Sequence, residues 1–416
     1  MSNIKIKQKN SSLSFLAKYI DLKTLLICFV LVVFGLLSIY SATFAFDPEL
    51  NRFYRQLLFA MIGFAALFIT ANIPTHYIKS GAMPFFIITN IILIAVFFFG
   101  SEVYGTRGWL RIGGWSLQPS ELSKIGLLLV IAKHLSNKGN NVSNIWDLGI
   151  LTGYFLVPFM LINLQPDFGT ALVFLVLFVG ILFWGGFDAY YIVLLIACGV
   201  MFVASLTSNT LALIVGLASG ILLLFFRKKI KIYAIGLSII VGMAFLSPIF
   251  YDSLAPHQQA RIDVFTNPGS DAQGAGYNVI QSILAVGSGG VTGKGYMEGT
   301  LTQLRYIPMQ WTDFIYSVPA EEFGLVGALV VLFFLLALVY RGINIAANSR
   351  DIFNSVIAFG ASTIFIFHIV VNIGMVLGVI PVMGIPLPFL SYGGTSLLSN
   401  LILVGLLMNI HRNNSR

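Results

Sequence analysis

Long apolar stretches recur along almost the whole chain of 416 residues, and they limit the folds that it can adopt. Each stretch of about 17 to 25 residues is long enough to cross a hydrocarbon core of roughly 30 Å as an α-helix. The residues are 57% hydrophobic and only 10% charged, whereas a soluble domain has about 25% charged residues. The segments of about ten alternating residues that are typical of a membrane β-barrel are absent from the sequence. The sequence therefore predicts an all-α polytopic integral membrane protein.

We expect about twelve membrane-spanning helices. The predicted spans are residues 22–42, 55–73, 82–100, 120–136, 146–163, 168–186, 189–206, 210–226, 231–250, 314–340, 353–379 and 394–410. The first stretch is too long for the core of a signal peptide and lacks a clear cleavage site, so we interpret it as a retained helix. A large outer loop of residues 251–313 separates the ninth and tenth spans. We expect residues 1–416 to form a single membrane domain.

Basic residues are distributed unequally between the two sets of loops. If the N-terminus is cytoplasmic, the inner loops hold about sixteen of the 24 Lys and Arg residues and the outer loops about seven. The inner group is Lys5, Lys7, Lys9, Lys18, Lys23, Lys79, Lys133, Lys138, Arg227, Lys228, Lys229, Lys231, Arg341, Arg350, Arg412 and Arg416. Membrane proteins keep such an excess on the cytoplasmic side, so we expect both termini in the cytoplasm. The net charge of +8 is then a topology signal and does not indicate nucleic-acid binding.

Ionisable residues within predicted spans are costly, so they are candidates for function. Glu121 and Lys124 open the fourth span three residues apart, which places them on one helix face where they can pair. Arg107 and Arg111 lie just before them in the outer loop GTRGWLRIGGWSLQP. Two interpretations of the pair stay open. One is a helix-capping acid beside a lysine that snorkels to the interface, and the other is a polar pair in a functional cavity.

Further polar residues lie near the outer ends of other spans. Gln165 and Asp167 precede the sixth span, where Asp167 taken alone is best explained as an N-terminal cap. Asp313 precedes the tenth span, and the adjacent Glu321 and Glu322 lie about two turns further along it. Two adjacent acids at that depth are not explained by a solvated helix face.

Two glycine-containing segments complete the outer polar set. The segment PLPFLSYGGTS, residues 386–396 with Ser391, predicts a broken entry to the last span, which protein or a wet cavity must satisfy. The segment GSGGVTGKG, residues 287–295, is similar to a phosphate-binding loop. However, Ser288 replaces its first glycine and Gly295 replaces the Ser or Thr that holds magnesium, so we reject nucleotide hydrolysis. Lys294 could still approach an outer phosphate, but turn chemistry explains these glycines better.

Five blocks of the sequence carry a family resemblance. They are RGWLRIGGWSLQPSELSK, QPDFGTA, GAGYNVIQSILAVGSGGVTGKGY, TDFIYSVPAEEFGLVG and NIGMVLGVIPVMGIPLPFLSYGGTS, in that order along about residues 105–410. On these blocks the chain resembles the SEDS family (shape, elongation, division and sporulation), the polytopic peptidoglycan glycosyltransferases of the bacterial cytoplasmic membrane. The form IPLPFLSYGG after NIGM favours the RodA branch over the FtsW branch.

The resemblance implies a reaction and a candidate catalytic residue. Family members polymerise lipid II, a disaccharide-peptide carried on undecaprenyl pyrophosphate, on the outer face of the membrane during cell elongation. Their essential aspartate precedes a Gly-x-Gly-Tyr element in the large outer loop, and Asp271 matches that place. We expect Asp271 to act as general base in an inverting displacement. Arg107, Arg111, Lys124 or a divalent cation, Mg²⁺ or Mn²⁺, would balance the charge of the leaving pyrophosphate.

The resemblance also implies cavity residues and partners. The matching cavity residues are Glu121, Lys124, Gln165, Asp167 and Asp313. The expected partners are a class B penicillin-binding transpeptidase and other proteins of the elongation complex, because the chain shows no domain that could cross-link peptides.

The chain departs from the usual family pattern at three places. Ala272 follows the candidate base where relatives usually have proline, and Gln310 and Trp311 stand where many have an acid and a histidine. The family usually has ten spans, so one hairpin within residues 187–250 is surplus. A hairpin inserts two spans, and because this number is even, the large loop stays on the outer side of the membrane. A lipid II flippase or other transporter and a non-catalytic scaffold remain the alternatives, and a solitary acid in an outer glycine-rich loop favours the polymerase.

Overall fold

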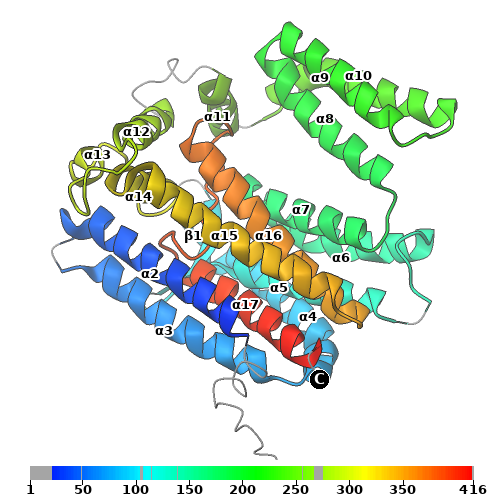
Figure 1. Cartoon of the computed structure of the whole chain (residues 1–416). Helices are drawn as coiled ribbons and strands as arrows, with labels where there is room; N and C mark the ends of the chain where they lie inside the picture. The colour runs from blue at the N-terminus through cyan, green and yellow to red at the C-terminus, as the bar shows by residue number, and fades with distance from the viewer. Residues whose placement is uncertain are drawn as a thin grey trace, which may run out of the picture.

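The computed structural model describes residues 21–47, 49–103, 106–113, 115–137, 139–254, 256–266 and 275–414. Within these residues the chain is a bundle of helices with one small sheet (Figure 1). The candidate base and several basic residues of the predicted inner face lie outside the described residues, namely Asp271, Lys5, Lys7, Lys9, Lys18, Lys138 and Arg416.

The helices follow one another along the chain. They are α2 (Leu22–Phe44), α3 (Asn51–Asn72), α4 (Thr75–Phe99), α5 (Pro119–Leu135), α6 (Ile145–Asn163), α7 (Phe168–Trp184), α8 (Ala189–Thr207), α9 (Asn209–Leu224), α10 (Ile230–Asp252), α11 (Pro256–Thr266), α12 (Ala275–Ser288), α13 (Thr300–Gln303), α14 (Ser317–Glu322), α15 (Gly324–Ala347), α16 (Ile352–Val376) and α17 (Gly394–Asn414). The sheet consists of β1 (Ser101–Val103), β2 (Thr106–Ile112) and β3 (Trp115–Leu117).

Every predicted span corresponds to a helix, namely α2 to α10 and α15 to α17. Among the described residues, 9 of these helices are long and apolar enough to cross a membrane, and α7 and α9 are shorter apolar helices. The chain is therefore a multi-pass helical membrane protein, and the count of twelve crossings stays a prediction.

The predicted tenth span, residues 314–340, is wrong at its start. The helix breaks after α14, and the long apolar helix α15 begins at Gly324, which has a φ of 65°. A side chain at this glycine would lie 2.3 Å from the backbone nitrogen of Gly293. The close approach of a distant loop therefore requires a glycine here, and its left-handed conformation separates α14 from α15.

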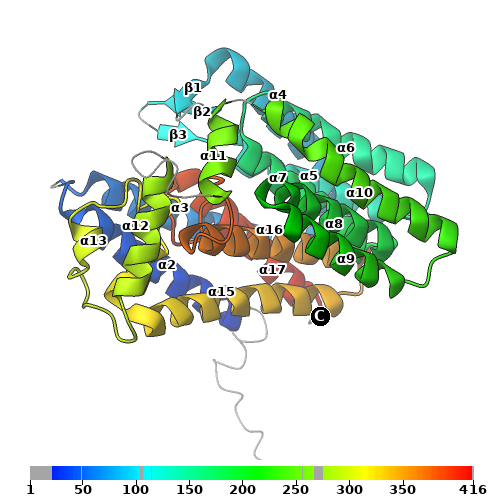
Figure 2. The same cartoon turned by 90° about the horizontal axis from the view of Figure 1, so that it is seen from above.

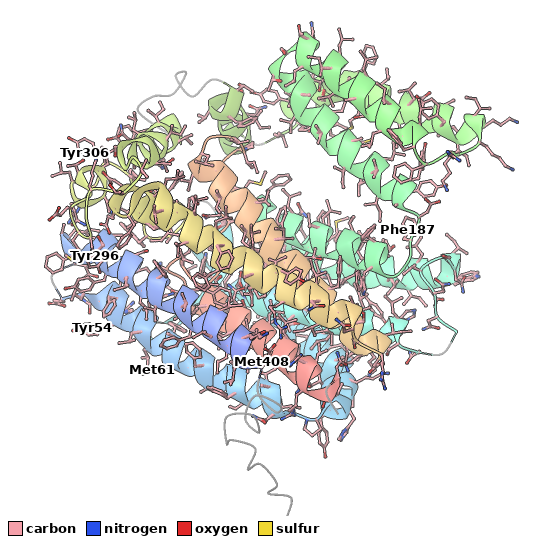
Figure 3. The ribbon with its side chains drawn as sticks, viewed as in Figure 1. Tyr54, Met61, Phe187, Tyr296, Tyr306 and Met408 are labelled. Atoms are coloured by element: carbon pink, nitrogen blue, oxygen red, sulfur yellow. The ribbon has the colours of Figure 1, made fainter. Side chains whose placement is uncertain are left out.

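Helices α16 and α17 form the centre of the bundle. In each of them 72% of the most apolar window is buried inside the protein. Helix α16 packs against α15, α7 and α5 (Figure 2). Helix α17 packs along α3. The outer helices expose apolar side chains instead, such as Tyr54 and Met61 on α3 (Figure 3). In a membrane protein this exterior is solvated by lipid.

Helices α8, α9 and α10 form a separate small bundle at one edge of the molecule (Figure 1). They share their own apolar core, which includes Tyr190, Met201 and Ile240. The Tyr190 hydroxyl donates to the carbonyl of Ile232 at 2.9 Å, and Lys228 pairs with Asp188 at the turn side. These helices occupy the 187–250 region in which the sequence predicts a surplus hairpin, and they pack mainly against one another.

Candidate functional site

The segment before α5 is an antiparallel sheet with the strand order β1-β2-β3, where the sequence predicts only a loop. Leu110 pairs with Leu117 and Ile112 with Trp115 across the second hairpin. Alternate residues of a strand face the same side, so Arg107 and Arg111 lie on one face of β2, and both are exposed. The short sheet therefore presents two guanidinium groups directly before α5.

Glu121 and Lys124 form a buried ion pair in the first turns of α5. The Lys124 Nζ lies 2.8 Å from Glu121 Oε2, and the Ser399 hydroxyl of α17 donates to the same oxygen at 2.5 Å. Lys124 is only 1% exposed and Glu121 only 5%. The predicted pairing is confirmed, and the snorkelling interpretation is wrong because the ammonium does not reach the surface.

Gln118 connects the start of α5 to two other helices. Its backbone N–H donates to the Thr395 hydroxyl of α17 at 3.2 Å, and its side-chain amide donates to Asp167 Oδ2 at 3.4 Å. Thr395 in turn donates to the carbonyl of Ser116 in β3 at 3.4 Å. The amino-terminal ends of α5, α7 and α17 and the small sheet therefore meet at one place.

Asp167 and Gln165, in the turn between α6 and α7, bond to different parts of the bundle. Asp167 accepts from the backbone N–H of Thr170 at 3.1 Å and from its hydroxyl at 2.8 Å, so the predicted helix cap is confirmed. Gln165 is buried and donates to the carbonyl of Leu93 in α4 at 3.1 Å. Asp167 thus joins the group around Gln118, while the amide of Gln165 ties the turn to α4.

The connection between α16 and α17, residues 377–393, carries Ser391 and is irregular, as the sequence predicts. The Ser391 hydroxyl donates to the carbonyl of Thr312 at 2.6 Å and accepts from the backbone N–H of Leu387 at 2.8 Å. Asn372 donates to the carbonyls of Asp313 and Ile385, each at 2.8 Å. Protein groups therefore satisfy this backbone within the bundle, and Ser391 holds the connection against the segment that contains Asp313.

His368 of α16 belongs to the same region, and the sequence predictions missed it. It is 2% exposed and interacts electrostatically with both Lys124 and Glu121. Its Nδ1 lies 3.0 Å from the carbonyl oxygen of Pro386 in the α16–α17 connection. An ionisable residue inside an apolar span was the available signal.

Lys294, Glu321 and Glu322 form a second polar cluster around α14. Glu321 is fully buried and accepts from Lys294 Nζ at 2.7 Å and from the backbone N–H groups of Leu301 and Thr302, each at 2.9 Å. Burial acts to raise the pKa of Glu321, but these hydrogen bonds outweigh it and hold the pKa below its ordinary value. Lys294 is therefore engaged by a carboxylate.

Glu322 lies in a different environment although it is adjacent in sequence. It accepts hydrogen bonds from the Ser41 hydroxyl of α2 and from the Gln303 amide. Burial raises the pKa of Glu322 above its ordinary value, because these neutral donors stabilise a carboxylate less than an ammonium does.

The glycine-rich segment 287–295 packs against this cluster. Gly293 has a φ of 83°, and a side chain there would lie 2.1 Å from the carbonyl oxygen of Glu322. The backbone N–H groups of Lys294 and Gly295 donate to the carbonyls of Glu321 and Glu322 at 3.1 and 2.9 Å. The glycines thus serve turn geometry and close backbone packing, and the rejection of a nucleotide loop agrees with this arrangement.

A family model described as cell cycle protein, covering FtsW, RodA and SpoVE, matches residues 22–214 and 203–416. The chain belongs to this family. It is 33% identical over 393 residues to the peptidoglycan glycosyltransferase MrdB of Escherichia coli K12, covering 94% of each chain. It is 32% identical to the peptidoglycan glycosyltransferase RodA of Treponema pallidum, covering 94% of this chain and 97% of the relative. The chain is accordingly a peptidoglycan glycosyltransferase of the RodA type.

Solved structures share the fold of this RodA-type chain. The crystal structure of the rod shape determining protein RodA of Thermus thermophilus aligns with a TM-score of 0.63 at 25% identity, over 95% of this chain and 98% of the other. A structure described as coordinating polymerization and crosslinking in a peptidoglycan synthase complex aligns with a TM-score of 0.71 at 26% identity, over 95% and 98%.

The RodA-type site can contribute charge and positioning from several helices. Arg107 and Arg111 are exposed, and Lys124 is paired with a buried carboxylate. In the described ranges, no group of three His, Cys, Asp or Glu side chains could hold a metal ion. These residues therefore do not form a divalent-cation site by themselves, and we derive no step through a cation.

Proposed function

We propose that this glycosyltransferase polymerises lipid II at the outer ends of α5, α7 and α17, with Asp271 as general base. The supporting observation is the buried Glu121–Lys124 pair directly behind a sheet that exposes Arg107 and Arg111. A buried ion pair inside a membrane bundle is costly unless it serves function or specificity. Its position beside a cationic surface suits a reaction that releases a pyrophosphate.

In the proposed reaction, the 4-hydroxyl of the acceptor GlcNAc attacks the anomeric carbon of the donor. The new C–O bond forms as the bond to the pyrophosphate breaks, and undecaprenyl pyrophosphate leaves with the bonding electrons. Asp271 accepts the hydroxyl proton, and such positioned proton transfer is typically worth about 10² to 10⁴-fold in rate. Attack opposite the α-linked pyrophosphate inverts the carbon and gives a β-linked glycan.

Arg107 and Arg111 are the proposed partners of the leaving pyrophosphate. Guanidinium groups bind phosphate oxygens in a bidentate manner and remain charged at all relevant pH values. Lys124 is paired and buried, so we assign it with Glu121 to the positioning of the helix ends. A requirement for Mg²⁺ or Mn²⁺ stays a prediction.

The proposed orientation places the reaction outside the cell. The basic residues Arg227, Lys228 and Lys229 lie together at the α9–α10 turn, which supports a cytoplasmic location of that end and of both termini. We further propose a class B penicillin-binding transpeptidase as partner, with other elongation-complex proteins. The similarity to a peptidoglycan synthase complex supports such an assembly.

Polymerisation of labelled lipid II by purified protein with a cognate transpeptidase tests the role of Asp271. Asp271→Asn should produce no glycan chains while melting like the wild type. Asp263→Asn is a matched control, because Asp263 lies exposed in α11 of the same loop and its carboxylate accepts from the nearby Tyr251 hydroxyl. Equal activity of wild type and Asp271→Asn would remove Asp271 as base. Lipid II translocation in liposomes without polymerisation by the wild type would favour the flippase alternative.

A further inference from the structure

The imidazole of His368 has one satisfied and one unsatisfied nitrogen. A carbonyl oxygen can only accept, so Nδ1 carries the proton that is donated to Pro386 at 3.0 Å. Nε2 is then an acceptor with a lone pair. It is buried and has no hydrogen-bond partner among the described residues. A buried polar atom of this kind needs a partner, either from protein or from water.

Other unsatisfied polar atoms lie on the two helices that flank His368. Both side-chain atoms of Asn400 in α17 and the Ser123 hydroxyl in α5 are buried and unpartnered within the described part of the chain. Asn400 is 1% exposed and Ser123 is 0% exposed. Lys124, which pairs with Glu121, contributes further N–H donors on α5.

We propose that ordered water joins these groups in a buried site between α5, α16 and α17, and that His368 is a positioning residue for the Glu121–Lys124 pair. The near-complete burial of the groups keeps a sugar or a lipid headgroup away from them, so water is the partner that we propose. Water bridges buried polar groups of this kind with about three hydrogen bonds each. Donors from Lys124 and Asn400 and the acceptor on His368 supply the complementary partners.

His368 thereby couples two parts of the site that are distant in sequence. Its Nδ1–H holds the α16–α17 connection at Pro386. In the proposed arrangement its Nε2 reaches the ion pair of α5 through water. A shift of the α16–α17 connection therefore alters the geometry of the Glu121–Lys124 pair, and a shift of the pair alters the connection. The inference rests on the glycosyltransferase activity for its kinetic readout, but the coupling itself can be measured without activity.

The kinetic test compares His368→Leu with His368→Gln. Glutamine keeps a donor for Pro386 and an acceptor for water, whereas leucine keeps only volume. Loss of one positioned hydrogen bond corresponds to roughly tenfold in rate. We expect His368→Leu to lower kcat roughly tenfold with little change in KM, and His368→Gln to restore most of it. Ser362→Ala is the control, because within the described ranges that hydroxyl donates to the carbonyl of Ala358 in its own helix.

A double-mutant cycle on melting temperature tests the coupling independently of catalysis. Lys124→Met should lower the melting temperature less in a His368→Leu background than in the wild type, because the water-linked partner is already gone. Additive shifts would overturn the proposal, as would equal activity of His368→Leu and wild type. An inactive wild type with a non-additive cycle would contradict the assigned reaction and leave the coupling supported.

Discussion

Glu321 and Glu322 are adjacent and both buried, but their pKa values are shifted in opposite directions, so the same substitution should affect them differently. Glu321→Gln replaces one carboxylate oxygen by an NH₂ group. Oε1 accepts from Lys294 and Leu301 and Oε2 accepts from Thr302, so the NH₂ group faces a donor at hydrogen-bond distance whichever oxygen it replaces. Removing one partner of a buried ion pair typically costs about 3 to 5 kcal/mol of stability. Because the amide keeps one acceptor oxygen, the expected loss of stability is about 3 kcal/mol.

Glu322→Gln should cost far less. Burial already raises the pKa of Glu322, so the neutral form is the one that the folded protein tolerates better. A neutral glutamine keeps an acceptor for Ser41 and Gln303, and the expected change is within about 1 kcal/mol. The two variants therefore form a matched pair that differs in position by one residue.

The pH dependence gives a second readout for the same pair. The pKa of Glu321 is lowered in the folded protein, so its stabilisation is fully present above the ordinary carboxyl pKa of about 4.3 and is lost as the pH falls further. The difference in apparent melting temperature between wild type and Glu321→Gln should thus be constant from pH 8 to about 5 and shrink below that. Melting is compared in one detergent at one scan rate. Equal destabilisation by both substitutions, or a larger effect of Glu322→Gln, would refute this reasoning.

Three further outcomes are expected. Gly293→Ala should lower the melting temperature strongly, because its side chain would lie 2.1 Å from a carbonyl oxygen. Gly290→Ala has open space around it and should cost only about 1 kcal/mol of stability. Equal effects of the two substitutions on thermal melting would contradict this. Lys124→Met should destabilise the protein and abolish polymerisation, because a buried carboxylate loses its cation; wild-type activity would show that the pair is dispensable. After replacement of both native cysteines, maleimide labelling should reach a cysteine at Ser208 only from outside and one at Lys229 only from inside, and the reverse pattern would overturn the orientation.

The spans were predictable because the bilayer leaves a chain few options. Backbone groups in hydrocarbon must bond within the same helix, so hydropathy alone locates α2 to α10 and α15 to α17, although it misplaces the start of α15. The Glu121–Lys124 pair was also predictable, since residues three apart share a helix face.

Contacts between distant segments were not predictable from one sequence. The Ser41 hydroxyl meets Glu322, and the His368 imidazole meets Pro386, only because of how the helices pack. The break at Gly324 depends on the approach of Gly293, which no local pattern reports. Strands of three residues, such as β1 and β3, are too short to carry a period-two signal.

Product analysis after incubation of the purified wild-type protein with labelled lipid II tests the assigned reaction most directly. We predict glycan chains of many disaccharides with release of undecaprenyl pyrophosphate, and complete digestion of these chains by a muramidase specific for β-1,4 linkages. Intact lipid II under conditions where a known polymerase is active, or chains that resist the muramidase because they are α-linked, would contradict an inverting polymerase.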